Sequence, residues 1–102
     1  MKVTVRSIMK AVPGRMAEAM ELEKKHMAIA TRVLGISARL YRPLSGGGDV
    51  MNTIISEGEF DSLAAFEAHP AKMMADPEAQ ALFPKLEAVI ESHEIELYMP
   101  LP

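Results

Sequence analysis

Three histidines, His26, His69 and His93, are the side chains best suited to moving protons in this chain of 102 residues. An imidazole can donate or accept a proton near neutral pH. His26 precedes Met27 in an amphipathic helical pattern, so its ring is expected at the edge of the space between that helix and a sheet. We predict that His26 is the catalytic histidine, which orients or deprotonates a ligand. The alternative is a structural His26, half-buried and hydrogen-bonded to a backbone carbonyl.

Further polar and soft apolar residues could line the same space. Two hydroxyls interrupt apolar strands, and nine Met residues in a chain with few aromatic residues suggest an adaptable pocket. His69 precedes Pro70, where a helix should break, and is expected at a loop mouth. Replacing His69 or His93 is nevertheless expected to have little effect. The predicted substrate-binding residues are Ser7, Met27, Met51, Thr53, Phe66 and His69. In the alternative, the Met side chains simply fill the core.

Composition argues against several other kinds of site. The absence of Cys excludes disulfides, thiolate nucleophiles and Cys-ligated metals. The three histidines are scattered and lack an HExxH spacing, so no metal site is predicted. Flavin and haem motifs are absent, so no cofactor is predicted either. The net charge of −3 disfavours nucleic acid. The glycines at 46–48 are not followed by Lys-Ser or Lys-Thr, so they predict a hairpin tip and not a phosphate loop.

Apolar runs are too short for a membrane span of about 20 residues. Met1-Lys2 is not followed by the apolar stretch of a signal peptide. We therefore expect a cytoplasmic chain with no membrane partner.

The elements that position these residues follow from periodicity. Alternation predicts strands at 2–10, 36–41, 50–57 and around 95–99. Three- to four-residue spacing predicts helices at 15–34, at 62–69 after a cap at Asp61, and after the second break at Asp76-Pro77. The order strand, helix, strand, strand, helices, strand predicts an α+β ferredoxin-like βαββαβ sandwich, a single domain over 1–102. Its four-stranded antiparallel sheet should have strands one and three in the centre and the helices on one face.

The other face of this sheet should be open. Strand alternation places Val3, Val5 and Met9 on the helix side, so charged and tyrosyl residues occupy the opposite side. These are Arg6, Arg39, Tyr41, Glu94, Glu96 and Tyr98. Such a face either meets water or pairs with the same face of a second copy, and we predict the homodimer.

Several short motifs resemble the NIPSNAP family. They are Val5-Arg6, Pro13-Gly14-Arg15, His26 eight residues ahead of Leu34-Gly35, Ala75-Asp76-Pro77-Glu78-Ala79-Gln80, and Ile95-Glu96-Leu97 followed by Pro100. That family belongs to the dimeric α/β-barrel group, which also contains antibiotic-biosynthesis-type monooxygenases. The resemblance implies a homodimer with two sheets face to face and a cleft between sheet and helices in each subunit. The lack of Trp counts against the haem-degrading relatives.

Three functions follow as hypotheses. The first is a NIPSNAP-like dimer that binds a small apolar or aromatic molecule under the first helix, without a cofactor. The second is a cofactor-free monooxygenase of the antibiotic-biosynthesis type. The third is a structural or interaction module whose pocket is filled by its own Met side chains.

Overall fold

The computed structural model describes residues 1–46 and 48–102. Gly47, the middle glycine of the predicted hairpin tip, lies outside the described residues. The elements are β1 (Val3–Ala11), α1 (Met16–Leu34), β2 (Ala38–Tyr41), the 3-10 turn η1 (Val50–Asn52), β3 (Thr53–Phe60), α2 (Leu63–Met74), α3 (Pro77–Val89) and β4 (Ile90–Tyr98). In the described ranges, no helix is long and apolar enough to cross a membrane.

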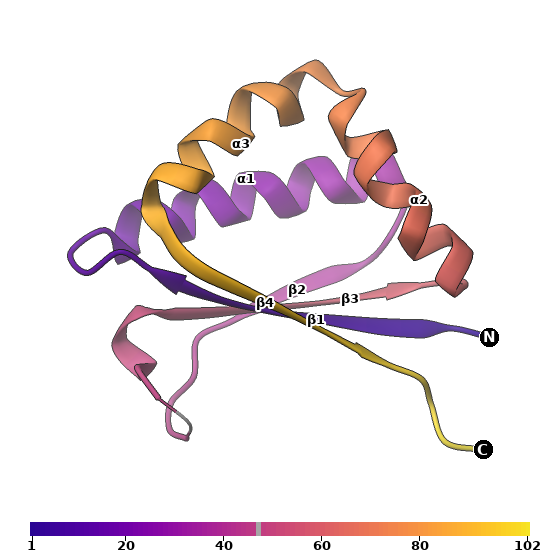
Figure 1. Cartoon of the computed structure of the whole chain (residues 1–102), viewed down its shortest axis with the longest axis horizontal. Helices are drawn as coiled ribbons and strands as arrows, with labels where there is room; N and C mark the ends of the chain where they lie inside the picture. Colours follow the sequence, from indigo (N-terminus) through magenta and orange to yellow (C-terminus); the bar gives the residue numbers. More distant parts are fainter. Residues whose placement is uncertain (47) are drawn as a thin grey trace.

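The strands form one antiparallel sheet in the order β2-β3-β1-β4, with all three helices on one face (Figure 1). This arrangement confirms the predicted ferredoxin-like α+β fold with strands one and three in the centre. The core lies between sheet and helices. Its buried residues include Met9, Ala11 and Ile54 of the sheet, Ala19, Leu22 and Ile29 of α1, and Leu82, Leu86 and Val89 of α3.

Strand register separates the two faces of the sheet as alternation predicts. Val5 pairs with Gly58 and Leu97, and Met9 pairs with Ile54 and His93. Directly paired residues share a face, so these rows lie under the helices. Arg6 pairs with Glu57 and Glu96, and this row lies on the opposite face, here called the open face.

The predicted helix break at Pro70 is wrong, because α2 continues through Pro70 to Met74. Proline has no N–H to donate to the carbonyl of Phe66 four residues earlier. The His69 side chain takes its place, with Nδ1 at 2.6 Å from the Phe66 carbonyl oxygen. The cap is also one residue later than predicted: Ser62, not Asp61, accepts from the Ala65 N–H at 3.0 Å.

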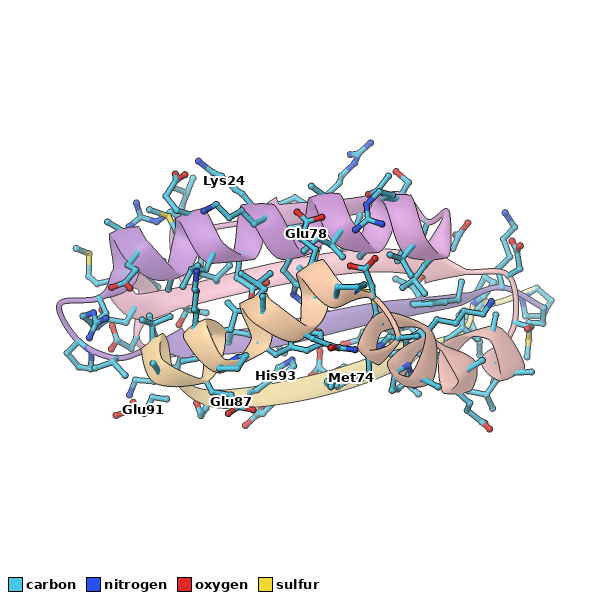
Figure 2. The ribbon with its side chains drawn as sticks, turned by 90° about the horizontal axis from the view of Figure 1, so that it is seen from above. Lys24, Met74, Glu78, Glu87, Glu91 and His93 are labelled. Atoms are coloured by element: carbon cyan, nitrogen blue, oxygen red, sulfur yellow. The ribbon has the colours of Figure 1, made fainter. Side chains whose placement is uncertain are left out.

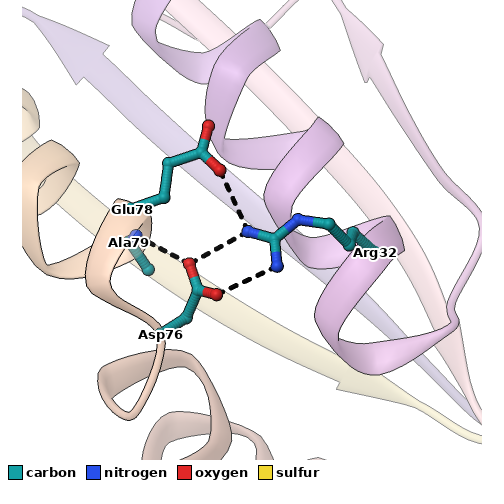
Figure 3. Close-up of polar contacts among 4 residues, drawn as sticks. All are labelled: Arg32, Asp76, Glu78 and Ala79. Atoms are coloured by element: carbon teal, nitrogen blue, oxygen red, sulfur yellow. Dashed lines mark hydrogen bonds and ion pairs between the residues drawn. The ribbon is translucent and has the colours of Figure 1, made fainter.

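The predicted break at Asp76-Pro77 is confirmed, and it is tied to α1 by an arginine. Asp76 accepts from the backbone N–H of Ala79 and caps α3. Arg32 of α1 donates to both oxygens of Asp76 and to Glu78, each at 3.0 Å (Figure 3). This charge-assisted contact joins the end of α1 to the α2–α3 junction.

The Arg32–Asp76 contact should make stability depend on pH in the acid range. The hydrogen bonds from Arg32 hold the pKa of Asp76 below its ordinary value of 3.8. The carboxylate therefore stabilises the fold above pH 3.8, and this contribution is lost as the pH falls through the folded-state pKa. Asp76→Asn keeps a capping side chain but removes the charge.

We expect the thermal midpoint of Asp76→Asn to lie below that of the wild type at neutral pH and to meet it in acid. Thermal unfolding followed by circular dichroism between about pH 7 and pH 2 measures this gap. Asp61→Asn, at an exposed position, is the control. A gap that stays constant over the whole range would contradict the assignment.

Candidate functional site

A cavity of about 650 Å³ lies between the sheet and the helices. Strands β1, β3 and β4 form its floor, and α1, α2 and α3 supply its walls. Apolar side chains predominate, among them Val5, Met9, Met27, Ala30, Leu34, Ile36, Phe60, Phe66, Met73, Phe83, Leu86 and Ile95. All three histidines of the chain also line it. Its size and composition are those of a site for a small organic molecule.

His26 lines the cavity from α1, as predicted. Its side chain is about one-quarter exposed (27%), and its ring lies edge-on to Phe83, with 5.6 Å between the centroids. Nδ1 lies 3.3 Å from an Oε2 oxygen of Glu23. The partner of His26 is thus a carboxylate on the preceding turn, and not the backbone carbonyl of the structural alternative. Because a carboxylate oxygen accepts, Nδ1 donates, and Nε2 is the ring nitrogen left for a ligand.

Glu23 was not among the residues predicted for the site. Its side chain is only 3% exposed, and it lines the same cavity. The sequence contains one signal for it, since Glu23 is three residues before His26 and next to the buried Leu22 on the inner side of α1.

His69 lines the cavity from within α2, and not from a loop mouth as predicted. Its ring packs against Phe60 and Phe66, with centroids 5.3 and 5.0 Å away. Since the carbonyl oxygen of Phe66 can only accept, His69 Nδ1 carries the hydrogen. His69 and His26 therefore use the same ring nitrogen for a local contact and keep Nε2 for a ligand.

Hydroxyl groups lie on the floor of the cavity. Ser7 pairs across the strands with Ser56, and both residues line the cavity. Ser7 and three other predicted binding residues, Met27, Phe66 and His69, are thus brought together with His26. Ser56 was missed, although strand pairing makes it the direct neighbour of Ser7.

Two predicted binding residues, Met51 and Thr53, lie elsewhere. The segment 50–52 forms η1 instead of the start of a strand, which leaves Met51 67% exposed. Thr53 pairs with Lys10 on the open face, and its Oγ1 donates to the Asp49 carbonyl at 2.5 Å. Met51 therefore lies in a turn and Thr53 lies on the open face, and neither of them lines the cavity.

The mouth of the cavity lies where α2 and α3 pass over β4. Met74, Glu87, Glu91 and His93 are exposed lining residues on this side (Figure 2). Met73, the neighbour of Met74, is instead buried in the core. No cluster of His, Asp and Glu able to hold a metal ion occurs among residues 1–46 and 48–102.

The open face carries all six residues predicted for the dimer interface. Arg39, Glu57, Arg6 and Glu96 form one row of alternating charge across the four strands. Arg6 donates to Glu57 at 2.7 Å, and this hydrogen bond raises the pKa of the Arg6 guanidinium. The Tyr98 hydroxyl donates to Glu96, which raises the pKa of Tyr98. Tyr41, Ile55, Ile8 and Glu94 form the next row.

Solved structures share this architecture over nearly the whole chain. A NIPSNAP family protein from Agrobacterium tumefaciens superposes with a TM-score of 0.78 at 24% identity, covering 98% of this chain and 86% of that one. A NIPSNAP domain protein from Burkholderia xenovorans gives a TM-score of 0.80 at 21% identity, covering 99% and 95%. The chain has the fold of the NIPSNAP proteins. The resemblance predicted from the sequence is confirmed in this respect.

The structure of an oxygenase also resembles this chain. SnoaB, a cofactor-independent oxygenase from Streptomyces nogalater, superposes with a TM-score of 0.75 at 19% identity, covering 99% of this chain and 94% of that one. No protein-family model matches the chain, and no curated protein does. The shared feature is therefore the ferredoxin-like fold of the NIPSNAP and antibiotic-biosynthesis monooxygenase proteins.

Proposed function

We propose that this protein binds a small apolar or aromatic molecule in the cavity between sheet and helices. The observation that carries the proposal is the cavity itself, about 650 Å³ in volume, with apolar walls and His26, His69, Ser7 and Ser56 in its lining. Apolar walls provide most of the affinity of such sites, and a few polar groups fix the orientation of the ligand. A module filled by its own Met side chains would lack this space.

We further propose that two copies pair through the open face, without a cofactor and in the cytoplasm. The alternating charges of Arg39, Glu57, Arg6 and Glu96 can be matched by the same row of a second copy. The apolar row beside it, with Tyr41, Ile55 and Ile8, gives the pairing a centre that excludes water.

A second candidate function, cofactor-free oxygenation, is supported by the fold shared with SnoaB. In this proposal His26 Nε2 removes a proton from an acidic methylene, and the resulting carbanion adds dioxygen to give a hydroperoxide after protonation. Loss of water leaves a ketone, so one oxygen atom enters the product and the other enters water. Oxygen uptake with tetralone, an aromatic ketone with acidic C–H groups, separates this function from binding alone.

Naphthylmethanol is a suitable probe for the binding proposal. The chain has no Trp, so naphthyl fluorescence can be followed without a tryptophan background. We expect saturable binding of one molecule per chain and a loss of about tenfold in affinity for His26→Gln, because Gln does not hold a ring nitrogen at the same place. His93→Gln, at the exposed mouth, should bind as the wild type does. Equal affinity of wild type and His26→Gln would remove His26 from the site.

A further inference from the structure

The charged side chains of the cavity lining have one sign. Glu23, Glu87 and Glu91 line it, and no Lys or Arg does so among the residues that the structure describes. A fourth lining residue, Glu57, turns its carboxylate to Arg6 on the open face. Glu91 pairs with Lys10 at 3.4 Å, so Glu23 and Glu87 are the lining carboxylates without a Lys or Arg partner among the described residues. A ligand inside the cavity therefore finds no Lys or Arg in the lining to pair with a negative charge of its own. Moving an anion into such a site leaves that charge desolvated and unpaired.

A carboxyl group also lies in the interior of the cavity, on Glu23. Its side chain is 3% exposed, and His26 is its hydrogen-bonding partner among the described side chains. Carboxyl groups without a Lys or Arg partner thus lie both at the mouth, on Glu87, and on the inner surface of α1, on Glu23. Two charges of the same sign repel more strongly in a partly desolvated space than in water. This repulsion disfavours an anionic ligand inside the cavity.

The histidines favour a ligand that carries a hydrogen-bond donor. His26 and His69 both use Nδ1 locally, with Glu23 and with the Phe66 carbonyl. In a neutral ring whose Nδ1 carries the hydrogen, Nε2 is an acceptor. In that form the two rings present one acceptor each, from α1 and from α2, to one apolar cavity, and an O–H or N–H of a ligand can donate to either of them.

We infer that the cavity selects an apolar molecule that carries a hydrogen-bond donor and no negative charge, an inference that rests on the proposed binding function. Alcohols, phenols and amines meet this description. Carboxylic acids and phosphate esters, which are anionic at neutral pH, do not. The polar lining thus acts as a charge filter on ligands that the apolar walls alone would accept.

A series of four naphthyl probes tests the inference on the unmodified protein. Naphthalene, naphthylmethanol, naphthylmethylamine and naphthoate share one apolar skeleton and differ in donor and charge. We expect naphthylmethanol and naphthylmethylamine to bind more tightly than naphthalene and at least about tenfold more tightly than naphthoate. Naphthoate that binds as tightly as naphthylmethanol would overturn the inference while leaving the binding function intact. Failure of all four probes to bind would overturn both.

Glu23→Gln tests the source of the filter. The amide has nearly the shape of the carboxylate without its charge, so the preference for naphthylmethanol over naphthoate should shrink. Glu21→Gln is the matched control, because Glu21 is exposed on the outer side of α1 and pairs with Lys24 at 3.2 Å. A preference that changes equally in both variants would show that the overall charge of the protein, and not the cavity, sets the selectivity.

Discussion

Replacing Ile8 by Glu is expected to convert the protein from a dimer into a monomer. Ile8 lies on the open face and is half-buried, paired with Ile55 on one side and Glu94 on the other. In the proposed dimer this row is covered by the second copy. A carboxylate there would be desolvated between Arg6 and Lys10, whose charges are already paired with Glu57 and Glu91. It would also lie close to Glu94, at a cost of about 3 kcal/mol or more. The dissociation constant should therefore rise more than about a hundredfold.

Light scattering at micromolar concentration measures this change directly. Leu63→Glu is the matched control, since Leu63 is an exposed apolar residue of α2, on the helix-covered face of the sheet. Arg39→Glu, which breaks only the alternation of the charged row, should weaken the dimer less than Ile8→Glu does. The proposal of pairing through the open face is wrong if the wild type is a monomer at this concentration, or if folded Ile8→Glu stays dimeric.

Replacing Ser7 by Phe should abolish ligand binding. Ser7 lies on β1 beneath the helices, and its neighbours Ser56 and Ile95 line the same floor. A phenyl ring at this position extends into space that the ligand would occupy. Naphthylmethanol affinity is expected to fall by about a hundredfold or more, because the apolar contacts of the probe are lost together with its access to the floor.

Ser37→Phe gives the control, because Ser37 is exposed and does not line the cavity. Circular dichroism and light scattering establish that both variants fold and assemble as the wild type does. Undiminished binding by folded Ser7→Phe would place the ligand somewhere other than this cavity.

Period-two alternation is why the sheet could be predicted well. Val3, Val5 and Met9 lie on one side of β1, and Thr4, Arg6 and Ile8 lie on the other. The strand therefore has only one arrangement that buries its apolar side. The same rule placed the six residues of the open face and put Ser7 under the helices. It could not place Met51, because Asp49 accepts hydrogen bonds that close a turn at 50–52 and delay β3. Thr53 follows the alternation and lies on the open face with Ile55.

The helices were harder to place because their inner residues are chemically mixed. The apolar stripe predicted for α1 is Met16, Met20, Met27, Ala30 and Leu34. Of these Ala30 is buried, and the other buried residues of α1 are Ala19, Leu22, Glu23 and Ile29. Ala19 is small enough to let α1 approach its neighbours closely. The buried Glu23 side chain accepts a hydrogen bond from His26. A pattern of apolar residues alone counts Glu23 as solvent-facing. The helix interior at Pro70 was likewise unpredictable without knowing that His69 satisfies the carbonyl of Phe66.

The position of β4 in the sheet bears on how the protein avoids aggregation. β4 is nine residues long and forms an edge of the sheet, so one side of its main chain has no neighbouring strand among the residues that the structure describes. Ile95 and Leu97 are about half exposed, which makes this edge a template for the β4 strand of another molecule. Glu91, Glu94 and Glu96 interrupt it at short intervals. A β4 strand of another copy would bring carboxylates against carboxylates, and this repulsion opposes the growth of the edge into an extended sheet.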